Sequence, residues 1–326
     1  MTVSAVERLV PTISLKDFET RRDEITSQLV EAAENSGFFM LVDHGISVDE
    51  IKHQFGISKS FFDLPKDVKG KTAYDLNAGL GWEYKAQTRR LTGTDQKESL
   101  WLSHHSNWPS ERDVPGFQES TENFMNKCGV ISHKVLRCFA TALSFPENYF
   151  EEPMDAKKPD TLSRLRMLHY PPSHNLPGTW GAGAHTDVGC LTLLFQLDGG
   201  DGLEICPGRE NVGSKAIGDT FFPLPAKTGP IVVNIGDMLM SWSDDRFKAT
   251  YHRVRAMEGD SPSRYSVAYF NQGRKDFVFQ GPLKKYPAMT CGEYIQSYTV
   301  AQFATNAKKS SAPGILQGPA LVAVKN

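Results

Sequence analysis

The stretch "GAGAHTDVGCLTLLFQ", residues 181–196, begins with metal-ligating side chains and continues as an apolar run. In an extended segment successive side chains point to opposite faces, so His185 and Asp187 share one face, about 7 Å apart. An imidazole and a carboxylate side by side can bind one metal ion. The stretch therefore predicts a buried strand that carries two metal ligands.

A third ligand stands later in the chain, in the strand-like run "KATYHRVRA" that contains His252. Two imidazoles and one carboxylate form a facial triad, which leaves coordination positions open. Open positions indicate catalysis, because structural metal sites are closed. We expect His185, Asp187 and His252 to hold a catalytic metal ion.

The run "RYSVAYF" places Arg264, Ser266, Ala268 and Phe270 on one face of a strand. A guanidinium and a hydroxyl at this spacing can bind a single carboxylate. A divalent metal with two neutral histidines and one aspartate keeps a positive charge, which a dianionic ligand overcompensates. Arg264 would restore neutrality, so the pattern predicts an anion bound between the metal and Arg264.

The rest of the chain predicts a mainly β protein with supporting helices and a jelly-roll core. Helical spacing in 16–39, a capping box at Ser47 and Glu50, and a helix over 123–145 give way after Leu162 to period-two runs. The expected strands are "LSRLRMLHYPP", "CLTLLFQ", "GLEIC", "PIVVNIGDMLMSW", "YHRV" and "RYSVAYF".

We expect one integrated domain with four regions. They are an N-terminal helix and strand region (1–105), supporting helices (106–160), the jelly-roll core (161–275) and a C-terminal helix with a loosely docked tail (276–326).

Composition excludes several classes of protein. With 40% hydrophobic and 23% charged residues and a formal net charge of -2, nothing favours binding to nucleic acid or a membrane surface. The five cysteines form no C-x-x-C pair, which fits a reducing compartment better than a disulfide framework. The absence of a signal-like or membrane-spanning apolar segment leads us to expect a cytoplasmic protein.

These motifs together resemble a known family. His185-Thr-Asp187, His252 and Arg264-Tyr-Ser266 match the H-x-D…H…R-x-S signature of the non-haem Fe(II), 2-oxoglutarate-dependent oxygenases. The order "GFFMLVDHGI", "FFDLPKDVK", "GLGW", "RMLHYPP", "HTDVGCLTLLFQ", "VVNIGDML" and "RYSVAYF" is similar to the isopenicillin N synthase-like branch, and "LHYPP" and "TLLFQ" are most similar to fungal members, such as thymine 7-hydroxylase and natural-product oxygenases.

The resemblance implies a double-stranded β-helix core, with Fe(II) on His185, Asp187 and His252. It implies that 2-oxoglutarate chelates the iron and that its distal carboxylate meets Arg264 and Ser266, with Tyr170 nearby. Dioxygen would then oxidise a small, cyclic or aromatic metabolite by hydroxylation or a related radical reaction, with release of succinate and carbon dioxide. A role in secondary metabolism follows from the same likeness.

Substrate contacts are expected from several further positions. Arg166 and Leu168 share a strand face with Tyr170, so we expect Arg166 to reach either the cosubstrate or an acidic or carbonyl-bearing substrate. Leu168 stands where plant members carry Asn. Phe270 matches a position that stacks on substrate rings, whereas Val188 replaces a Tyr of the thymine hydroxylase pattern, which argues against a nucleobase. In the lid-like segment "NAGLGWEYK" the expected contacts are Asn77, Leu80 and Trp82.

Three other readings stay open on the residues alone. An iron oxidase of the isopenicillin N synthase type would use the Arg264 and Ser266 pair for its substrate and need no 2-oxoglutarate. A zinc hydrolase is weakened because no Glu stands beside the ligands as general base. A non-catalytic ligand-binding module on the same fold would have been free to lose the triad.

Overall fold

The computed structural model describes residues 10–85, 88–89, 93–175, 180–210, 220–256 and 259–297. The helices are α2 (Arg22–Asn35), α3 (Val48–Phe62), α4 (Lys66–Lys69), α5 (Phe117–Ala142) and α6 (Asp237–Trp242), with a 3₁₀ turn at Gly70–Thr72. The strands are β1 (Thr12–Ser14), β2 (Phe38–Val42), β3 (Gly81–Tyr84), β4 (Thr88–Arg89), β5 (Gly93–Thr94), β6 (Glu98–Leu102), β7 (Arg164–Tyr170), β8 (Ser173–Asn175), β9 (Trp180–His185), β10 (Leu191–Gln196), β11 (Leu203–Glu210), β12 (Phe222–Pro223), β13 (Ile231–Ile235), β14 (Thr250–Arg255), β15 (Gly259–Ser261), β16 (Arg264–Asn271), β17 (Val278–Phe279) and β18 (Met289–Thr290).

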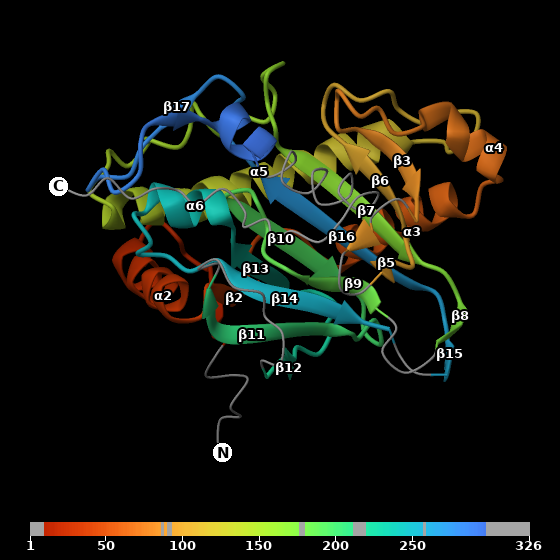
Figure 1. The fold of residues 1–326 in the computed structure, drawn as a ribbon, viewed down its shortest axis with the longest axis horizontal. Coiled ribbons are helices and arrows are strands. Elements are labelled where there is room, and N and C mark those ends of the chain that lie inside the picture. Colours follow the sequence, from red (N-terminus) through yellow and green to blue (C-terminus); the bar gives the residue numbers. More distant parts are fainter. Residues whose placement is uncertain are drawn as a thin grey trace, which may run out of the picture.

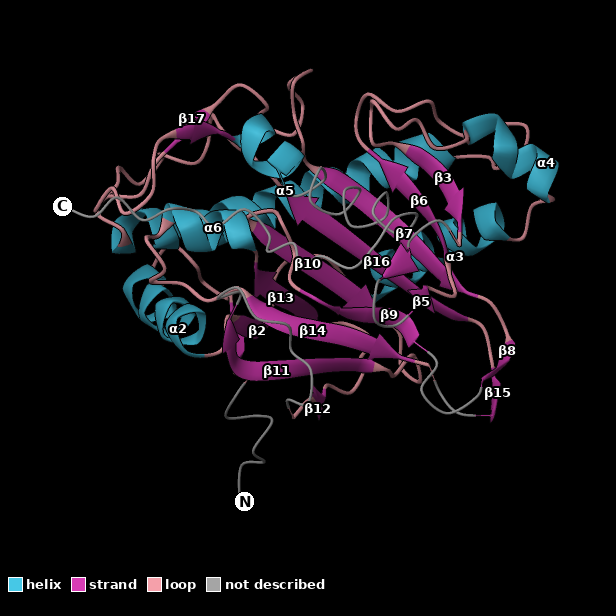
Figure 2. Cartoon of the chain, in the orientation of Figure 1, coloured by secondary structure: helices cyan, strands magenta, loops and turns pink. Residues whose placement is uncertain are grey.

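Two β-sheets form the body of the protein (Figures 1 and 2). The larger sheet has eight strands in the order β1-β2-β13-β10-β16-β7-β6-β3, and the smaller has four in the order β12-β11-β14-β9. Strands distant in sequence are therefore neighbours, as β10 lies between β13 and β16. This arrangement confirms the jelly-roll core of a double-stranded β-helix with supporting helices.

The large sheet buries its apolar side against the helices. In β10, Leu193 and Phe195 belong to the main apolar core, and the Phe195 ring meets Phe124 of α5 edge-on, with centroids 4.8 Å apart. Alternate residues of the same strand, Thr192 and Gln196, point to the other side of the sheet. That inner side, toward the small sheet, is where polar side chains gather.

Local signals in the sequence set the helix ends. The Ser47 hydroxyl accepts from the Glu50 N–H while the Glu50 carboxylate accepts from the Ser47 N–H, so the capping box is confirmed. Gly37 follows α2 with φ of 67°, and its N–H donates to the Ala32 carbonyl. A side chain there would also collide with the Lys248 carbonyl, because a Cβ atom would lie 1.9 Å from that oxygen.

Two predicted strands end earlier than expected. The strand over residues 230–242 was wrong in its second half, since β13 stops at Ile235 and residues 237–242 form α6. All six residues of α6 are buried, so its sequence shows no amphipathic period that would separate it from a buried strand. The stretch 181–196 is likewise two strands, β9 and β10, joined by a loop that contains Asp187.

The lid-like segment also differs from expectation, because Gly81–Tyr84 is an edge strand, β3, paired with β6. At the other end of the chain, residues 291–297 are helical as expected. The remainder of that predicted helix and the tail lie outside the described residues. Within the described residues no helix has the length and apolarity needed to cross a membrane.

Candidate metal centre and cosubstrate pocket

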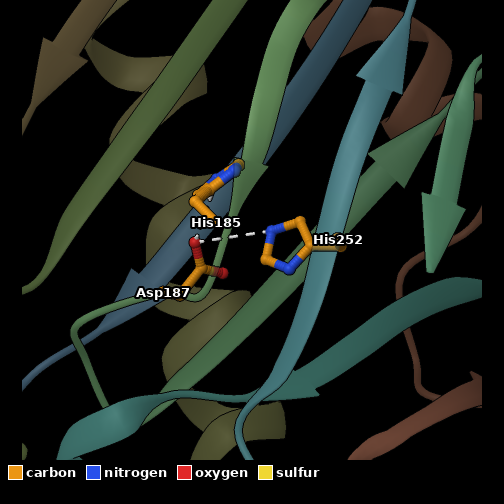
Figure 3. A group of neighbouring side chains, drawn as sticks. All are labelled: His185, Asp187 and His252. Carbon is orange, nitrogen blue, oxygen red and sulfur yellow. Dashed lines mark ion pairs between the residues drawn. The ribbon is translucent and has the colours of Figure 1, made fainter. Parts of the chain in front are cut away.

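The three predicted metal ligands meet between the two sheets (Figure 3). His185 ends β9, and His252 is its direct partner in the antiparallel neighbour β14. Asp187 lies in the loop just beyond β9, with its Oδ1 atom 3.8 Å from His185 Nε2 and 3.7 Å from His252 Nε2. One ligand atom from each residue falls within 4.8 Å of the others, which is close enough to surround a single ion.

Backbone carbonyls orient both imidazoles for metal binding. His185 Nδ1 lies 2.8 Å from the Gly183 carbonyl and His252 Nδ1 lies 3.2 Å from the Thr250 carbonyl. A carbonyl can only accept, so each Nδ1 carries the proton and each Nε2 presents its lone pair toward Asp187. The Phe38 ring meets His252 edge-on, with centroids 5.6 Å apart, and packs beside that imidazole.

Two buried side chains donate hydrogen bonds to the Asp187 carboxylate oxygen that does not face the histidines. Its Oδ2 atom accepts a hydrogen bond of 2.5 Å from the Thr192 hydroxyl and one of 2.8 Å from the Asn234 amide. These partners stand opposite each other on β10 and β13. Oδ2 is therefore hydrogen-bonded to side chains of the large sheet, and Oδ1 faces the two histidines.

This donor set fits a catalytic divalent metal. Two imidazole nitrogens and one carboxylate oxygen on one side of an ion are the facial arrangement typical of non-haem Fe(II) sites with open positions. His185 has 26% of its side chain exposed, against 9% for Asp187 and 10% for His252. The open side of the centre therefore lies toward His185.

The three predicted cosubstrate residues also come together, on the inner face of β16 and β7. Arg264 is paired in register with Tyr170, and its guanidinium lies 4.7 Å from the centre of the Tyr170 ring. Arg264 Nε donates to the Gly200 carbonyl at 2.8 Å. Ser266, two residues along the same face, is 3% exposed.

The guanidinium retains an unused donor that suits an anion. Among the described residues, buried Arg264 Nη1 has no hydrogen-bond partner, although Nε is satisfied. A buried charged donor without a partner is costly, and a carboxylate is the geometry-matched acceptor for it. The residues present thus fit the distal carboxylate of a dicarboxylic ligand such as 2-oxoglutarate.

Next to this anchor, an aromatic wall continues along the inner face. The Phe270 ring stacks on Trp101, with centroids 5.6 Å apart and 28° between planes. The Arg166 guanidinium lies 4.1 Å from the Trp101 ring centre and donates to the Glu83 carboxylate at 3.0 Å and to the Ser99 hydroxyl at 2.8 Å. A planar apolar surface with a fixed cation beside it can receive a ring that bears an acceptor group.

Leu168 joins the pocket face, whereas Val188 does not join the aromatic wall. Leu168 lies opposite Ser266 in register and is 7% exposed, so an apolar side chain flanks the serine on that side. Val188 is half-buried and packs against the main apolar core.

The Trp82 side chain does not lie on the inner face of the large sheet, although the sequence predicted a substrate contact there. Its Nε1 donates at 2.8 Å to Glu98, which also binds Lys69 on the helix side of the sheet. Asn77 is exposed and Leu80 is half-buried in the turn before β3. A hydrogen bond connects this turn to β7, because the Ala78 carbonyl accepts from the Arg164 guanidinium at 3.3 Å. Burial lowers the pKa of Arg164 to about 10, so it stays charged at neutral pH.

Sequence reasoning missed the residues that support the site rather than form it. Thr192 and Asn234 each appear as a single polar residue inside an apolar strand, which was the available signal. Trp101 and Glu83 gave no such signal, because their place depends on the pairing of β3, β6 and β7.

Comparisons with known proteins agree with this geometry. The family model of the 2OG-Fe(II) oxygenase superfamily matches residues 161–273. A second model, described as the non-haem dioxygenase in morphine synthesis N-terminal region, matches residues 10–125. The two matches cover the metal centre and the segments that precede it.

Curated relatives are similar over most of their length. The 2-oxoglutarate-Fe(II) type oxidoreductase ppzD of Metarhizium rileyi is 30% identical over 312 residues, with 85% of each chain covered. The proline hydroxylase buaE of Petromyces alliaceus is 31% identical over 297 residues, covering 83% of this chain and 88% of its own.

A solved structure matches in three dimensions as well. A full-length Neurospora crassa protein in complex with alpha-KG and thymine superposes with a TM-score of 0.76 at 29% identity, covering 91% of this chain and 97% of that one. Together with the relatives above, these matches show that the chain belongs to the 2OG-Fe(II) oxygenase superfamily and is a 2-oxoglutarate-dependent dioxygenase that uses Fe(II), 2-oxoglutarate and dioxygen.

Proposed function

We propose that His185, Asp187 and His252 hold Fe(II), and that Arg264 and Ser266 bind the distal carboxylate of 2-oxoglutarate. The observation that carries this proposal is the buried Arg264 Nη1, which no described residue pairs and which belongs to the inner face of the large sheet, the face to which Asp187 is hydrogen-bonded. Tyr170 supports the anchor by packing its ring beneath the guanidinium.

The iron and 2-oxoglutarate together supply dioxygen activation, in which 2-oxoglutarate is converted to succinate and carbon dioxide. The residues of the chain bind the ion and the cosubstrate and orient them relative to each other. Asp187 Oδ1 and the two Nε2 atoms would hold the ion from one side, and Arg264 would hold the distal carboxylate of the cosubstrate. The buried surroundings of Asp187 and His252 keep bulk water from that side of the centre.

For the substrate we propose a small metabolite with a ring, of the kind made in fungal natural-product pathways. The stacked pair Trp101 and Phe270 offers the ring an apolar aromatic surface, and the Arg166 guanidinium places a positive charge beside it. The proline hydroxylase and the thymine complex among the similar proteins both concern ring compounds. Val188, where the thymine hydroxylase pattern has Tyr, favours a ring other than a nucleobase.

The test is an anaerobic titration of Fe(II)-loaded protein with 2-oxoglutarate. Bidentate binding of the keto acid to iron produces a visible charge-transfer band, and succinate should form after oxygen is admitted. A saturable band together with succinate supports the assignment. Iron binding without either signal would overturn it.

The role of Arg264 is tested by Arg264→Leu. Loss of a charge-assisted contact should weaken 2-oxoglutarate binding by about tenfold or more in the same titration. Arg255→Leu is the control, because Arg255 stands on β14, is 52% exposed and pairs with Glu204. If wild type, Arg264→Leu and Arg255→Leu bind 2-oxoglutarate with equal affinity, the distal carboxylate is bound by a residue other than Arg264.

A further inference from the structure

Gln196, the last residue of β10, carries a buried amide for which the described residues provide no partner. The residue is 2% exposed, and both its Nε2 and its Oε1 lack a hydrogen bond within the described parts of the chain. Burying an amide unpaired is destabilising, and native proteins rarely keep such a group without a use. A ligand that supplies the missing partner would account for it.

The amide lies on the pocket side of the large sheet. In β10, Thr192 faces the pocket, since its hydroxyl donates to Asp187, whereas Phe195 packs against α5. Residues four apart in a strand share a face, so Gln196 points to the same side as Thr192. The metal centre and Gln196 thus lie at opposite ends of one strand face.

At its own end of that face, Gln196 stands beside the proposed carboxylate anchor. Ser266 is paired in register with Gln196 on one side and with Leu168 on the other. Side chains in such cross-strand pairs start about 4.5–5.5 Å apart. Arg264, two residues before Ser266 on the same face, holds the unused Nη1. Two buried donors that have no partner in the described chain therefore flank one buried hydroxyl.

We propose that Gln196 is a third residue that positions 2-oxoglutarate, donating a hydrogen bond from Nε2 to the distal carboxylate. The inference rests on the proposed role of Arg264 and Ser266. A carboxylate accepts up to about four hydrogen bonds, so it has room for a guanidinium, a hydroxyl and an amide. Because Leu168 makes the β7 side of Ser266 apolar, the additional polar contact comes from β10.

The direct test measures binding of 2-oxoglutarate to Fe(II)-loaded Gln196→Met and Gln196→Glu, without oxygen, from the charge-transfer band. Gln196→Met keeps an unbranched side chain of similar length and removes the amide, and we expect the dissociation constant to rise about tenfold. Gln196→Glu places a carboxylate against a carboxylate and should weaken binding further.

A matched ligand and a matched variant show whether the effect is a contact with the carboxylate. The ligand 2-oxopentanoate keeps the keto acid and the chain length but replaces the distal carboxylate by a methyl group, so its affinity should be the same for wild type and Gln196→Met. Asn271→Leu is the protein control, since Asn271 is also buried with an amide that no described residue pairs, but it points to the opposite side of the sheet.

The outcomes separate this inference from the proposed function. If Arg264→Leu weakens 2-oxoglutarate binding and Gln196→Met does not, only the role of Gln196 fails. If Gln196→Met weakens 2-oxoglutarate and 2-oxopentanoate equally, the side chain acts on the fold, and the inference is overturned. If Arg264→Leu itself has no effect, the anchor assignment fails first.

Discussion

His252 is the direct cross-strand partner of His185, and the two imidazole rings lie 4.3 Å apart between centroids with an angle of 50° between their planes. The pairing of β9 with β14 therefore sets the spacing of two proposed metal ligands that are far apart in sequence. Asp187 has no such support from its own segment, because it lies in a loop. Its position depends on Thr192, Asn234 and the backbone around it.

Replacing His185 by Ala should abolish Fe(II) binding and turnover together. The change removes one of the three proposed ligands, and one imidazole with one carboxylate would hold the ion much less tightly. Metal stoichiometry after gel filtration and succinate release measure the two effects. His53→Ala, an exposed histidine on α3, should keep both, and full activity in His185→Ala would refute the site.

Removing the partners of Asp187 Oδ2 should weaken the metal without removing a ligand. We expect Thr192→Val and Asn234→Leu each to lower Fe(II) affinity by about 10–100-fold, as loss of outer-shell hydrogen bonds does in other metal sites. Competition with a chelator gives the affinity. Thr121→Val, at a buried threonine of α5 remote from the site, should leave it unchanged, and unchanged affinity in both site variants would contradict the supporting role.

Gly236→Ala should disturb the loop that carries Asp187. A Cβ atom at residue 236 would lie 2.2 Å from the Gly189 carbonyl oxygen and 2.9 Å from that of Asp187, and both are backbone atoms. We expect a loss of about 1–3 kcal/mol in the free energy of unfolding and weaker Fe(II) binding. Urea denaturation and the chelator assay measure these.

The control for that variant is Gly56→Ala in the middle of α3. No atom lies within 4 Å of a Cβ placed there, so alanine should stabilise the protein by about 0.5–1 kcal/mol through helix propensity. If Gly236→Ala and Gly56→Ala change the free energy of unfolding and the Fe(II) affinity in the same way, close packing at Gly236 does not position the Asp187 loop.

The Glu98 carboxylate should make stability depend on pH. Burial by itself would raise its pKa, but hydrogen bonds from His169, Lys69 and Trp82 lower the pKa below the ordinary value of 4.5 overall. A lowered pKa in the folded state means that ionised Glu98 stabilises the fold above pH 4.5. This contribution is lost as the pH falls through the lower folded value.

Glu98→Gln should therefore cost about 3–5 kcal/mol at neutral pH, because it leaves the buried Lys69 ammonium without its carboxylate. The difference from wild type should shrink at acid pH, as melting temperatures between about pH 3 and pH 7 would show. The exposed Glu24→Gln should change stability little. A gap between wild type and Glu98→Gln that does not depend on pH would contradict the expected ionisation.

Much of the site could be predicted because its chemistry is concentrated in a few residue types. His185, His252, Arg264 and Ser266 are polar residues in apolar strands, Asp187 follows two residues after His185, and period two alone places Arg264 and Ser266 on one face. The capping box at Ser47 and Glu50 was equally readable, since it depends on residues only three positions apart.

What the sequence did not reveal depends on contacts between distant segments. Trp82 was expected in a lid over the pocket, but the pairing of β3 with β6 turns its ring toward Glu98 and brings Glu83 to the pocket instead. In the same way, Asn234 becomes a partner of Asp187 only through the register of β13 and β10. Neither register can be read from one sequence.

The three proposed metal ligands are attached to both sheets. His185 and His252 belong to the small sheet, whereas Asp187 is fastened to the large sheet by β10 and β13. An ion held by all three would therefore cross-link the two sheets, and the iron-loaded and iron-free proteins should differ in rigidity as well as in reactivity. At a free metal concentration of about 100 times the dissociation constant, the bound ion would add roughly 2.7 kcal/mol to the free energy of unfolding, so loss of iron would raise the fraction of unfolded protein.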